Sequence, residues 1–372
     1  MQYHWQQKDW PDFHYDLLSV DAYLLRYLEK TAYLSGILRA LPEALKSEVA
    51  VDMMTAEALK TSEIEGEFIS RADVKSSIRN HLGLSKPPEN VHDLRAIGLG
   101  QLMAEARNSF DVPLTEQQLF DWHRALLSYR KDLNNLGNWR QHSEPMQVVS
   151  GAMGGEKVHY EAPPSVEVPG MMSEFVRWFN ESEKADIKSS LVRAAIAHLY
   201  FESIHPFEDG NGRIGRVVAE KTLSQGLGAP VPFSLSRVIE ADKKAYYAAL
   251  ERAQQSNEIT KWLEYFIPVA LRALEDAEAE VLFIAKKAQF FNRFRGQLNE
   301  RQLKVVRRML DEGAAGFEGG MNARKYGDIT GASKATATRD LQQLQQLGVM
   351  RVVGGGRSTR YEVVLDSAGK DF

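Results

Sequence analysis

Long segments with helical periodicity constrain this chain more than any other feature of its sequence. In residues 189–204, apolar side chains recur every three or four positions, which places Leu191, Ala195 and Leu199 on one face of a helix. Comparable patterns occur in five further segments: 92–110, 116–129, 169–180, 241–255 and 260–287. The alternating strand and helix units that would predict a doubly wound sheet are missing from the sequence. We therefore expect a mainly α fold with a helical bundle at its core.

Composition and charge are those of an ordinary globular protein. The chain has 372 residues, of which 44% are hydrophobic and 26% charged, and its net charge is only −4. So small a charge favours neither nucleic acid nor a membrane surface as the partner of the whole chain. The absence of cysteine excludes disulfides, thiolate metal sites and cysteine nucleophiles. Neither a secretory signal nor a membrane-spanning apolar run is found, so a cytoplasmic location without membrane contact is expected.

One segment departs from the helical pattern. Residues 146–160 contain two short β-prone runs around a glycine-rich turn, which predicts a β-hairpin. From its own residues, the hairpin has the ordinary interpretation of a surface feature without a function.

The C-terminal part has the pattern of a separate domain. Three helices are predicted at 300–312, 321–330 and 334–347, followed by a hairpin of two strands at 349–353 and 360–364. This is the order of a winged helix-turn-helix domain, which we place at 295–372. Residues 299–365 hold 11 Lys and Arg against 7 Asp and Glu, a local net charge of +4.

The helix at 334–347 would be the recognition helix of such a domain. Its candidates for contacts with phosphates or bases are Lys334, Thr336, Thr338 and Arg339. Its core-facing residues would be Leu341, Leu344 and Leu347. The wing would carry Arg351, Arg357 and Arg360. Winged helices bind DNA or dock onto proteins, and the modest charge leaves both interpretations open.

The segment 205–216, HPFEDGNGRIGR, has the features of a phosphate site. Gly210 and Gly212 permit a tight turn into a helix whose first amides have no partner within that helix. Such a helix N-terminus binds anions, and Arg213 and Arg216 lie three residues apart on one face of it. A glycine turn or an arginine pair alone would be a weak signal, because both are common in solvent.

Two further residues in the first half of this segment, a histidine and an aspartate, make the signal specific. The neutral imidazole of His205 can accept a proton from a hydroxyl near physiological pH. The carboxylate of Asp209 would be repelled by phosphates unless a divalent cation lies between them. A base, a metal ligand, an amide-lined turn and two guanidinium groups thus fall within one short segment.

The segment 205–216 resembles the signature of the Fic family, HxFx[DE]GNGRxxR, with every specified position filled. The likeness extends over residues 60–275, where the hairpin at 146–160 resembles the target-binding flap of that family. Tyr246, Tyr247, Leu250 and Trp262 resemble the end of the Fic core. The resemblance implies a Fic-type helical bundle with a β-hairpin flap.

What the resemblance implies for activity is the transfer of AMP from ATP to a Ser, Thr or Tyr hydroxyl of a target protein, with release of pyrophosphate. His205 would be the catalytic base, and Asp209 would hold Mg²⁺. The ATP-binding residues would be Phe207, Glu208, Asp209, Gly210, Asn211, Gly212, Arg213, Arg216 and Tyr247. Of these, Phe207 would also anchor the loop in the core, and one of the two neighbouring tyrosines would be a core aromatic. The flap would pair with an extended target segment through the backbone of Val148, Val149 and Ser150.

A second motif, TSEIEG at 61–66, lies at the end of a predicted helix. From its residues alone it is an ordinary acidic helix terminus, with Gly66 as the stop. It resembles the Fic inhibitory motif [ST]xxxE[GN], with Thr61, Glu65 and Gly66 in the specified places. The resemblance implies that Glu65 pairs with Arg216 and occupies the guanidinium that would bind the γ-phosphate.

The sequence thus predicts an N-terminal helical region at 1–60, a Fic catalytic domain at 61–290 and a winged helix domain at 295–372. The leading interpretation is an autoinhibited protein adenylyltransferase that uses ATP and Mg²⁺, with a homodimer and self-modification as further expectations. One alternative is a DNA-binding regulator whose Fic domain senses nucleotide. Another is a Fic enzyme that removes AMP or transfers a different phosphate-containing group. Residues 1–50 either pack on the core or build a dimer surface.

Overall fold

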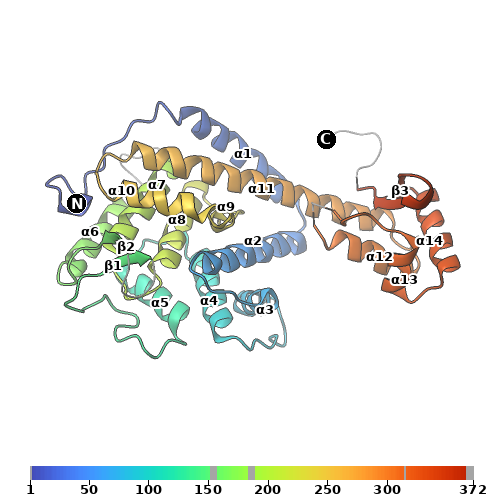
Figure 1. Ribbon diagram of the computed structural model, residues 1–372, viewed down its shortest axis with the longest axis horizontal. Helices are drawn as coiled ribbons and strands as arrows, with labels where there is room; N and C mark the ends of the chain where they lie inside the picture. Colours follow the sequence, from blue (N-terminus) through green and yellow to red (C-terminus); the bar gives the residue numbers. More distant parts are fainter. Residues whose placement is uncertain (1, 151–156, 183–188, 314–315, 366–372) are drawn as a thin grey trace. The chain divides into compact units, whose positions relative to one another are not determined.

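The computed structural model describes residues 2–150, 157–182, 189–313 and 316–365 (Figure 1). The chain divides into two compact units. The first comprises Met1–Ser35 and Ser47–Ala277, and the second comprises Gly36–Lys46 and Glu278–Phe372. The turn of the predicted hairpin, residues 151–156, and the end of the predicted C-terminal domain, residues 366–372, lie outside the described residues.

Helices dominate the chain up to residue 293, after a short 3₁₀ helix η1 (His4–Gln6). They are α1 (Asp21–Ala40), α2 (Glu43–Ile64), α3 (Arg71–His81), α4 (Leu94–Asn108), α5 (Glu116–Leu127), α6 (Val168–Glu181), α7 (Ser190–Ile204), α8 (Asn211–Leu227), α9 (Leu235–Ala241), α10 (Lys243–Ala253) and α11 (Thr260–Arg293). Between α5 and α6, β1 (Gln147–Ser150) pairs antiparallel with β2 (Lys157–Glu161). The mainly α fold class predicted from periodicity is confirmed.

Helix α7 is the centre of the first unit. Every residue from Leu191 to Ile204 is buried, and α8 lies alongside α7 (Figure 1). A helix enclosed on all sides must satisfy its polar side chains internally. Arg193 therefore donates to the Phe179 carbonyl, and the His198 ring lies 2.9 Å from the hydroxyl of Tyr246. The loop that follows α7 is thus anchored in the most enclosed element of the unit.

Two glycines of α4 allow neighbouring helices to approach closely. A Cβ atom at Gly98 would overlap the backbone carbonyl of Ala125 in α5. A Cβ atom at Gly100 would overlap the side chain of Ser77 in α3. The α3–α4–α5 layer therefore depends on the absence of side chains at these two positions.

The N-terminal segment packs on the core through aromatic rings. His4 contacts Trp10 and the ring of Tyr160 in β2, while Trp10 and Phe13 both contact Tyr200 of α7. Aromatic pairs of this kind add to the stabilisation that comes from area burial. Residues 4–13 therefore pack on the core, and the dimer surface expected as the alternative for residues 1–50 stays a prediction.

The second unit has a core of its own, formed by the last part of α11 and the elements that follow it. Its elements are α12 (Glu300–Leu310), α13 (Ala323–Thr330), α14 (Lys334–Gln346), β3 (Met350–Val353), the 3₁₀ helix η2 (Gly356–Ser358) and β4 (Arg360–Val363). Asn299, Asn322 and Ser333 cap the three helices, each accepting from the amide three residues later. Leu341 and Leu344 are buried, as their spacing predicted. The order of helices and strands is the one expected from the sequence.

The division between the units falls at Ala277 and Glu278, inside α11, whereas the predicted C-terminal domain begins at 295, after α11 has ended. Continuous helical periodicity carries no signal for such a division. In the described part of the chain, no helix combines the length and the apolar content needed to cross a membrane.

Replacing Gly98 by alanine should lower the free energy of unfolding by about 1–3 kcal/mol, because the added methyl group forces α4 and α5 apart. Gly170 is the matched control, since it is an exposed position of α6 with open space around an added Cβ. Gly170→Ala should raise stability by about 0.4–1 kcal/mol. Urea denaturation followed by circular dichroism measures both, and equal effects of the two changes would contradict the close approach at Gly98.

Candidate active site

His205 ends α7 in a left-handed backbone conformation, with φ 50° and ψ 60°. Among the described residues it is the only one other than glycine with positive φ. This conformation costs an ordinary L-residue roughly 1–2 kcal/mol. Strained residues of this kind persist only where the surrounding structure holds them, and they concentrate at functional sites.

The imidazole of His205 is neutral at physiological pH. Its Nδ1 lies 3.4 Å from the Glu202 carbonyl oxygen and 3.9 Å from the Glu202 carboxylate. Burial, together with the positive charge of Arg140, lowers the pKa of His205 to about 4. A proton on Nδ1 would face these acceptors, which leaves Nε2 free to accept a proton from a hydroxyl.

The loop between α7 and α8 is held in shape by two of its own residues. The side-chain amide of Asn211 accepts from the Phe207 amide and donates to the Phe207 carbonyl, both at 2.9 Å. The ring of Phe207 is fully buried and stacks on His123, with 4.1 Å between ring centroids. Phe207 therefore anchors the loop in the core, and the polar atoms of the Asn211 side chain are used within the loop.

The N-terminus of α8 has the geometry of an anion site. Gly210 occupies the N-cap position with φ 82°, and in the described chain no side chain caps this helix. The first amides of α8, with the positive end of its dipole, remain for a ligand. A Cβ atom at Gly212 would meet the Glu65 carboxylate and the Arg216 guanidinium, so only glycine leaves this space open.

Arg216 is buried and bound by residues from the end of α2. Its Nε donates to the Thr61 hydroxyl at 2.7 Å, and its Nη2 donates to the Thr61 carbonyl at 3.0 Å. The same Nη2 donates to the Glu65 carboxylate at 2.7 Å. The structure thus brings together the three residues that the two sequence motifs paired.

A glycine turn places two acidic residues against α8. The Glu67 amide donates to the Ser62 carbonyl, and the Gly66 amide donates to the Glu63 carbonyl, while Gly66 has φ 82°. This is the Schellman arrangement that ends many helices at a glycine. Because the turn is tight, residues 65 and 67 are held next to the same helix.

The second of these acidic residues binds the other arginine. Glu67 accepts from Arg213 Nη1 at 2.8 Å and from the Tyr129 hydroxyl at 2.9 Å. Arg213 is 3% exposed, so its charge needs such a partner. The motif at 61–66 stops one residue short of Glu67, and this pair was missed from the sequence.

The carboxylate of Asp209 is paired with arginines. One oxygen accepts from Arg130 Nη1 at 2.6 Å, and the other accepts from the Gly210 amide at 2.6 Å and lies 3.5 Å from Arg213 Nη2. The side chain is 34% exposed, so it is open to solvent and to a ligand. Among the described residues, no group of three or more His, Asp or Glu side chains could hold a metal ion.

Glu208 is turned away from this cluster. Its carboxylate accepts from the backbone amides of Asn134 and Asn135 and from the Asn135 side chain at 2.7 Å. These bonds fix the 134–135 segment against the loop. The residue was expected to bind ATP, and in the structure its carboxylate is occupied by protein donors.

A buried carboxyl group, that of Glu202, lies near Arg216. Glu202 is 4% exposed, and burial raises its pKa to about 8, with a smaller opposing effect of Arg216. In this part of the chain, neither Glu202 Oε1 nor Arg216 Nη1 has a hydrogen-bond partner. The carboxyl is therefore mostly protonated at neutral pH, and it leaves the positive charge of Arg216 largely uncompensated from that side.

The two neighbouring tyrosines have different surroundings. Tyr246 is buried and lies next to the ring of His198, so it is the core aromatic. Tyr247 is 40% exposed, and its hydroxyl lies 3.4 Å from the Ile64 carbonyl at the end of α2. Of these two tyrosines, only Tyr247 is accessible to a ligand.

The hairpin presents a backbone edge. In β1, Val148 faces Tyr160 of β2, the register shifts between Val148 and Val149, and Val149 is exposed. The sheet has two strands, so in the described part of the chain the second edge of β1 carries no partner strand. Ser150 lies at the end of the strand, and its backbone pairs with Lys157.

Two family models match the chain. Residues 113–223 match the Fic/DOC family, and this segment contains His205, Asp209, Arg213 and Arg216. Residues 3–84 match a domain of unknown function (DUF4172). The turn with Glu65 therefore lies in the part that matches the second model.

Curated relatives that match the chain carry the name protein adenylyltransferase. A probable protein adenylyltransferase of Aquifex aeolicus is 30% identical over 96 residues, which are 26% of this chain and 27% of the relative. The protein adenylyltransferase Fic of Drosophila melanogaster is 24% identical over 195 residues, 52% of this chain and 36% of the relative. The chain thus spans little more than a third, at most, of the length of these relatives.

Solved structures share the fold. A Fic family protein from Desulfovibrio desulfuricans G20 aligns with a TM-score of 0.53 and 18% identity, over 94% of this chain and 98% of that protein. A Fic domain containing signaling protein from Bacteroides thetaiotaomicron aligns with a TM-score of 0.50 and 19% identity, over 70% of this chain and 96% of that one. The chain therefore has a Fic-type fold, and its residues 113–223 are similar to the Fic/DOC family.

Proposed function

We propose that the first unit transfers AMP from ATP to a hydroxyl group of a protein, and that Glu65 inhibits this transfer. The observation that carries the proposal is a neutral His205 at the start of the loop that leads into an uncapped helix N-terminus with two buried arginines. A base beside an anion site suits a reaction in which a hydroxyl attacks a phosphate. The names of the Aquifex and Drosophila relatives support the same reaction.

The chemical step follows from the position of the base. Nε2 of His205 accepts the proton of a Ser, Thr or Tyr hydroxyl, and the oxygen attacks the α-phosphorus of ATP. A bond forms between that oxygen and phosphorus while the bond to the bridging oxygen of the β-phosphate breaks, and pyrophosphate leaves. Transfers of this type need positioning and charge neutralisation more than covalent catalysis.

The phosphates would be held by α8 and its arginines. The amides that follow Gly210 would bind phosphate oxygens, and Arg213 and Arg216 would bind the β- and γ-phosphates once their present partners have left. Tyr247 would lie beside the adenine. Mg²⁺ in nucleotide sites uses one or two carboxylates together with phosphate oxygens, so the single, partly exposed Asp209 fits this role. The ion would supply neutralisation of the phosphate charge.

The target protein would bind to the β1–β2 hairpin. An extended segment of a protein can add to the open edge of β1 through backbone hydrogen bonds at 148–150, with little dependence on its sequence. Such pairing would set the register of the target hydroxyl relative to His205. A segment of a second copy of this chain could occupy the edge in the same way, which would give self-modification in a homodimer.

Inhibition would act through the buried guanidinium. Glu65 binds Arg216 at 2.7 Å and holds it in a charge-assisted pair that competes with the γ-phosphate. A nucleotide bound without this contact would be misaligned at its α-phosphate, and small misplacements cost large factors in rate.

The alternative functions make different predictions for the same assay. A nucleotide-sensing regulator would bind ATP without labelling any protein, and an enzyme that removes AMP would release label from a modified target. Incubation of the protein with α-labelled ATP and Mg²⁺ tests the first function, because label on protein is expected only for AMP transfer. A target that already carries labelled AMP separates the other two, because only the AMP-removing enzyme would release the label.

For the second unit, the element order supports a winged helix-turn-helix that binds duplex DNA through α14. Lys334 and Arg339 are exposed on this helix. The wing is less suited than α14 to binding DNA phosphates. Its Arg351 and Arg360 both lie within ion-pair distance of Glu362, at 3.1 and 3.9 Å. Docking of a protein on the same face is the competing interpretation.

Glu65→Ala should raise the rate of AMP transfer to lysate proteins or to the chain itself, because Arg216 becomes free for the γ-phosphate. Glu63→Ala is the matched control, since Glu63 lies on the last turn of α2 and pairs with Lys60 rather than with an arginine of α8. Equal labelling by the two variants in α-labelled ATP would refute the inhibitory role.

His205→Ala in the Glu65→Ala background should lower the transfer rate by roughly 10²–10⁴-fold, because the base is lost. Affinity for MgATP, measured by calorimetry, should change little. With the base intact, the rate should be constant from neutral pH downward and fall as pH drops through about 4, where His205 becomes protonated. His92→Ala, at an exposed position, serves as the control. A rate insensitive to His205→Ala would contradict the mechanism.

Binding of the full chain to a labelled DNA duplex should weaken steeply between 50 and 200 mM salt if α14 contacts phosphates. Lys334→Ala and Arg339→Ala should each reduce the slope of log affinity against log salt by roughly 0.9. Lys304→Ala, an exposed change on α12, is the control. Salt-independent binding, or none, would favour the protein-docking interpretation.

A further inference from the structure

Arg140 is a buried arginine that binds the end of α7. It is 1% exposed and lies in the segment between α5 and β1. Its Nε donates to the His205 carbonyl at 2.8 Å, and its Nη2 donates to the Ile204 carbonyl at 3.3 Å. Its own amide donates to the Pro206 carbonyl at 3.0 Å. Three consecutive carbonyls at this helix end are therefore held by one residue.

These bonds satisfy carbonyls that the helix itself cannot. The last carbonyls of a helix have no amide partner within it, and a cation at this end is also favoured by the helix dipole. The left-handed conformation of His205 turns the chain out of α7, and the guanidinium of Arg140 fixes the carbonyls on both sides of that turn. The strain at His205 is thus offset by contacts that exist only in this conformation.

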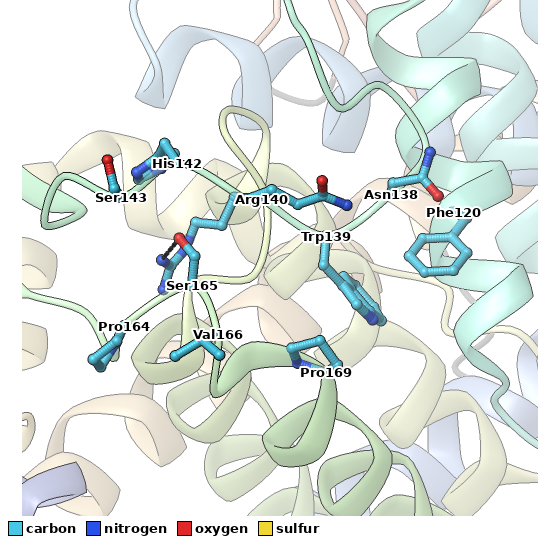
Figure 2. Close-up of a pocket in the computed structure, with 11 residues that line it drawn as sticks. Phe120, Asn138, Trp139, Arg140, His142, Ser143, Pro164, Ser165, Val166 and Pro169 are labelled. Atoms are coloured by element: carbon cyan, nitrogen blue, oxygen red, sulfur yellow. Dashed lines mark hydrogen bonds between the residues drawn. The ribbon is translucent and has the colours of Figure 1, made fainter.

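The other side of the guanidinium binds the segment that follows the hairpin. Arg140 Nη1 donates to the Ser165 hydroxyl at 2.8 Å, and Nη2 donates to the Pro163 carbonyl at 2.5 Å. Figure 2 shows the guanidinium directed at Ser165, beside a cavity of about 500 Å³ that is also lined by Trp139 and Pro164. A second link joins the hairpin to α7, because the buried Tyr160 hydroxyl of β2 donates to the Ser203 carbonyl at 2.6 Å.

We propose that Arg140 is a positioning residue which holds His205 in its left-handed conformation and fixes it to the base of the β1–β2 hairpin, so that the base and the target-binding edge form one rigid unit. The inference rests on the proposed AMP transfer, because the hairpin is given its role there. It adds that the register between target hydroxyl and imidazole is set by the planar fork of Arg140. A lysine has the charge but cannot bind two segments with the same planar geometry.

The charge of Arg140 also acts on the imidazole. The charged and titratable groups facing His205 are Arg140 from the segment before β1, Glu65 from the turn after α2, Asp209 from the loop and Glu202 from α7. After burial, Arg140 is the largest cause of the lowered pKa of His205. Replacing Arg140 by a neutral residue should raise this pKa, whereas Arg140→Lys should keep most of the effect.

The first test compares Arg140→Lys with Arg193→Lys in the Glu65→Ala background. Arg193 is the matched control because it is also buried, also binds a carbonyl and a hydroxyl, and lies near the start of α7, far from His205. Arg140→Lys should lower kcat for AMP transfer by about 10–100-fold, the size expected for a misplaced reacting group, while KM for ATP changes less than about twofold. Arg193→Lys should leave both unchanged. Equal kcat values for Arg140→Lys and the parent would overturn the proposal.

A milder change keeps the test informative if Arg140→Lys does not fold. Ser165→Ala removes only the bond between the guanidinium and the segment after β2, and leaves the bonds to the α7 carbonyls. It should lower kcat several-fold without changing KM for ATP. If kcat is unchanged, the link to the hairpin has no part in positioning and the proposal is wrong.

A spectroscopic measurement tests the contact between Arg140 and His205 independently of AMP transfer. Histidine ¹⁵N labelling, with His205 assigned through His205→Gln, gives the titration midpoint of its imidazole without any turnover. Arg140→Met should move that midpoint up, and Arg193→Met should not. A midpoint that stays in place in Arg140→Met would overturn the proposed contact even if AMP transfer is observed, and a shifted midpoint would support it even if no transfer is found.

Discussion

The burial of two guanidinium groups beside an uncapped helix N-terminus is the constraint on which the first unit depends. A buried positive charge is costly unless an acceptor faces it, and α8 presents two such charges, at Arg213 and Arg216. In this structure the acceptors are Thr61 of α2, Glu65 and Glu67 in the turn after it, and Asp209 in the loop before α8. The same charges are what a polyphosphate requires. Under the proposed function, protein carboxylates and nucleotide phosphates would compete for one pair of cations, and catalysis and inhibition would be two occupancies of the same site.

The rigidity of α7 determines the position of His205. The helix is enclosed on every side, its last carbonyls are bound by Arg140, and the loop after it is fixed by Phe207 and by the Asn211 amide. His205 therefore has little freedom relative to the start of α8. The exposed parts of the site are Asp209, Tyr247 and the edge of β1. These are the positions that a metal ion, the adenine of ATP and a target protein would have to reach. Preorganisation of the buried part and access to the exposed part are what a group-transfer site needs.

Local patterns predicted the elements and the residues that lie within one segment. The periodicity of α7, the glycines before α8 and Gly66 after α2 each encode their structure over a few positions, so the loop at 205–216 and the turn at 66 could be located. Glu67, Arg130 and Arg140 could not, because each acts on a partner 65 to 146 positions away in sequence. Nothing in the neighbourhood of Arg140 distinguishes it from a solvent-exposed arginine. Asn211 fills a specified position of the motif and Glu208 an unspecified one, yet both side chains bond to the protein, since a motif does not specify hydrogen-bond partners.

The Schellman turn at Gly66 has a consequence for how the site would open. Glu65 and Glu67 flank one glycine and reach two different arginines, so a movement of a few residues would withdraw both carboxylates together. Withdrawing one alone would leave the other carboxylate beside the arginines that the proposed triphosphate would bind, where like charges repel. Under the proposed inhibition, intermediate arrangements would therefore be disfavoured, and the turn would switch between two states rather than move gradually.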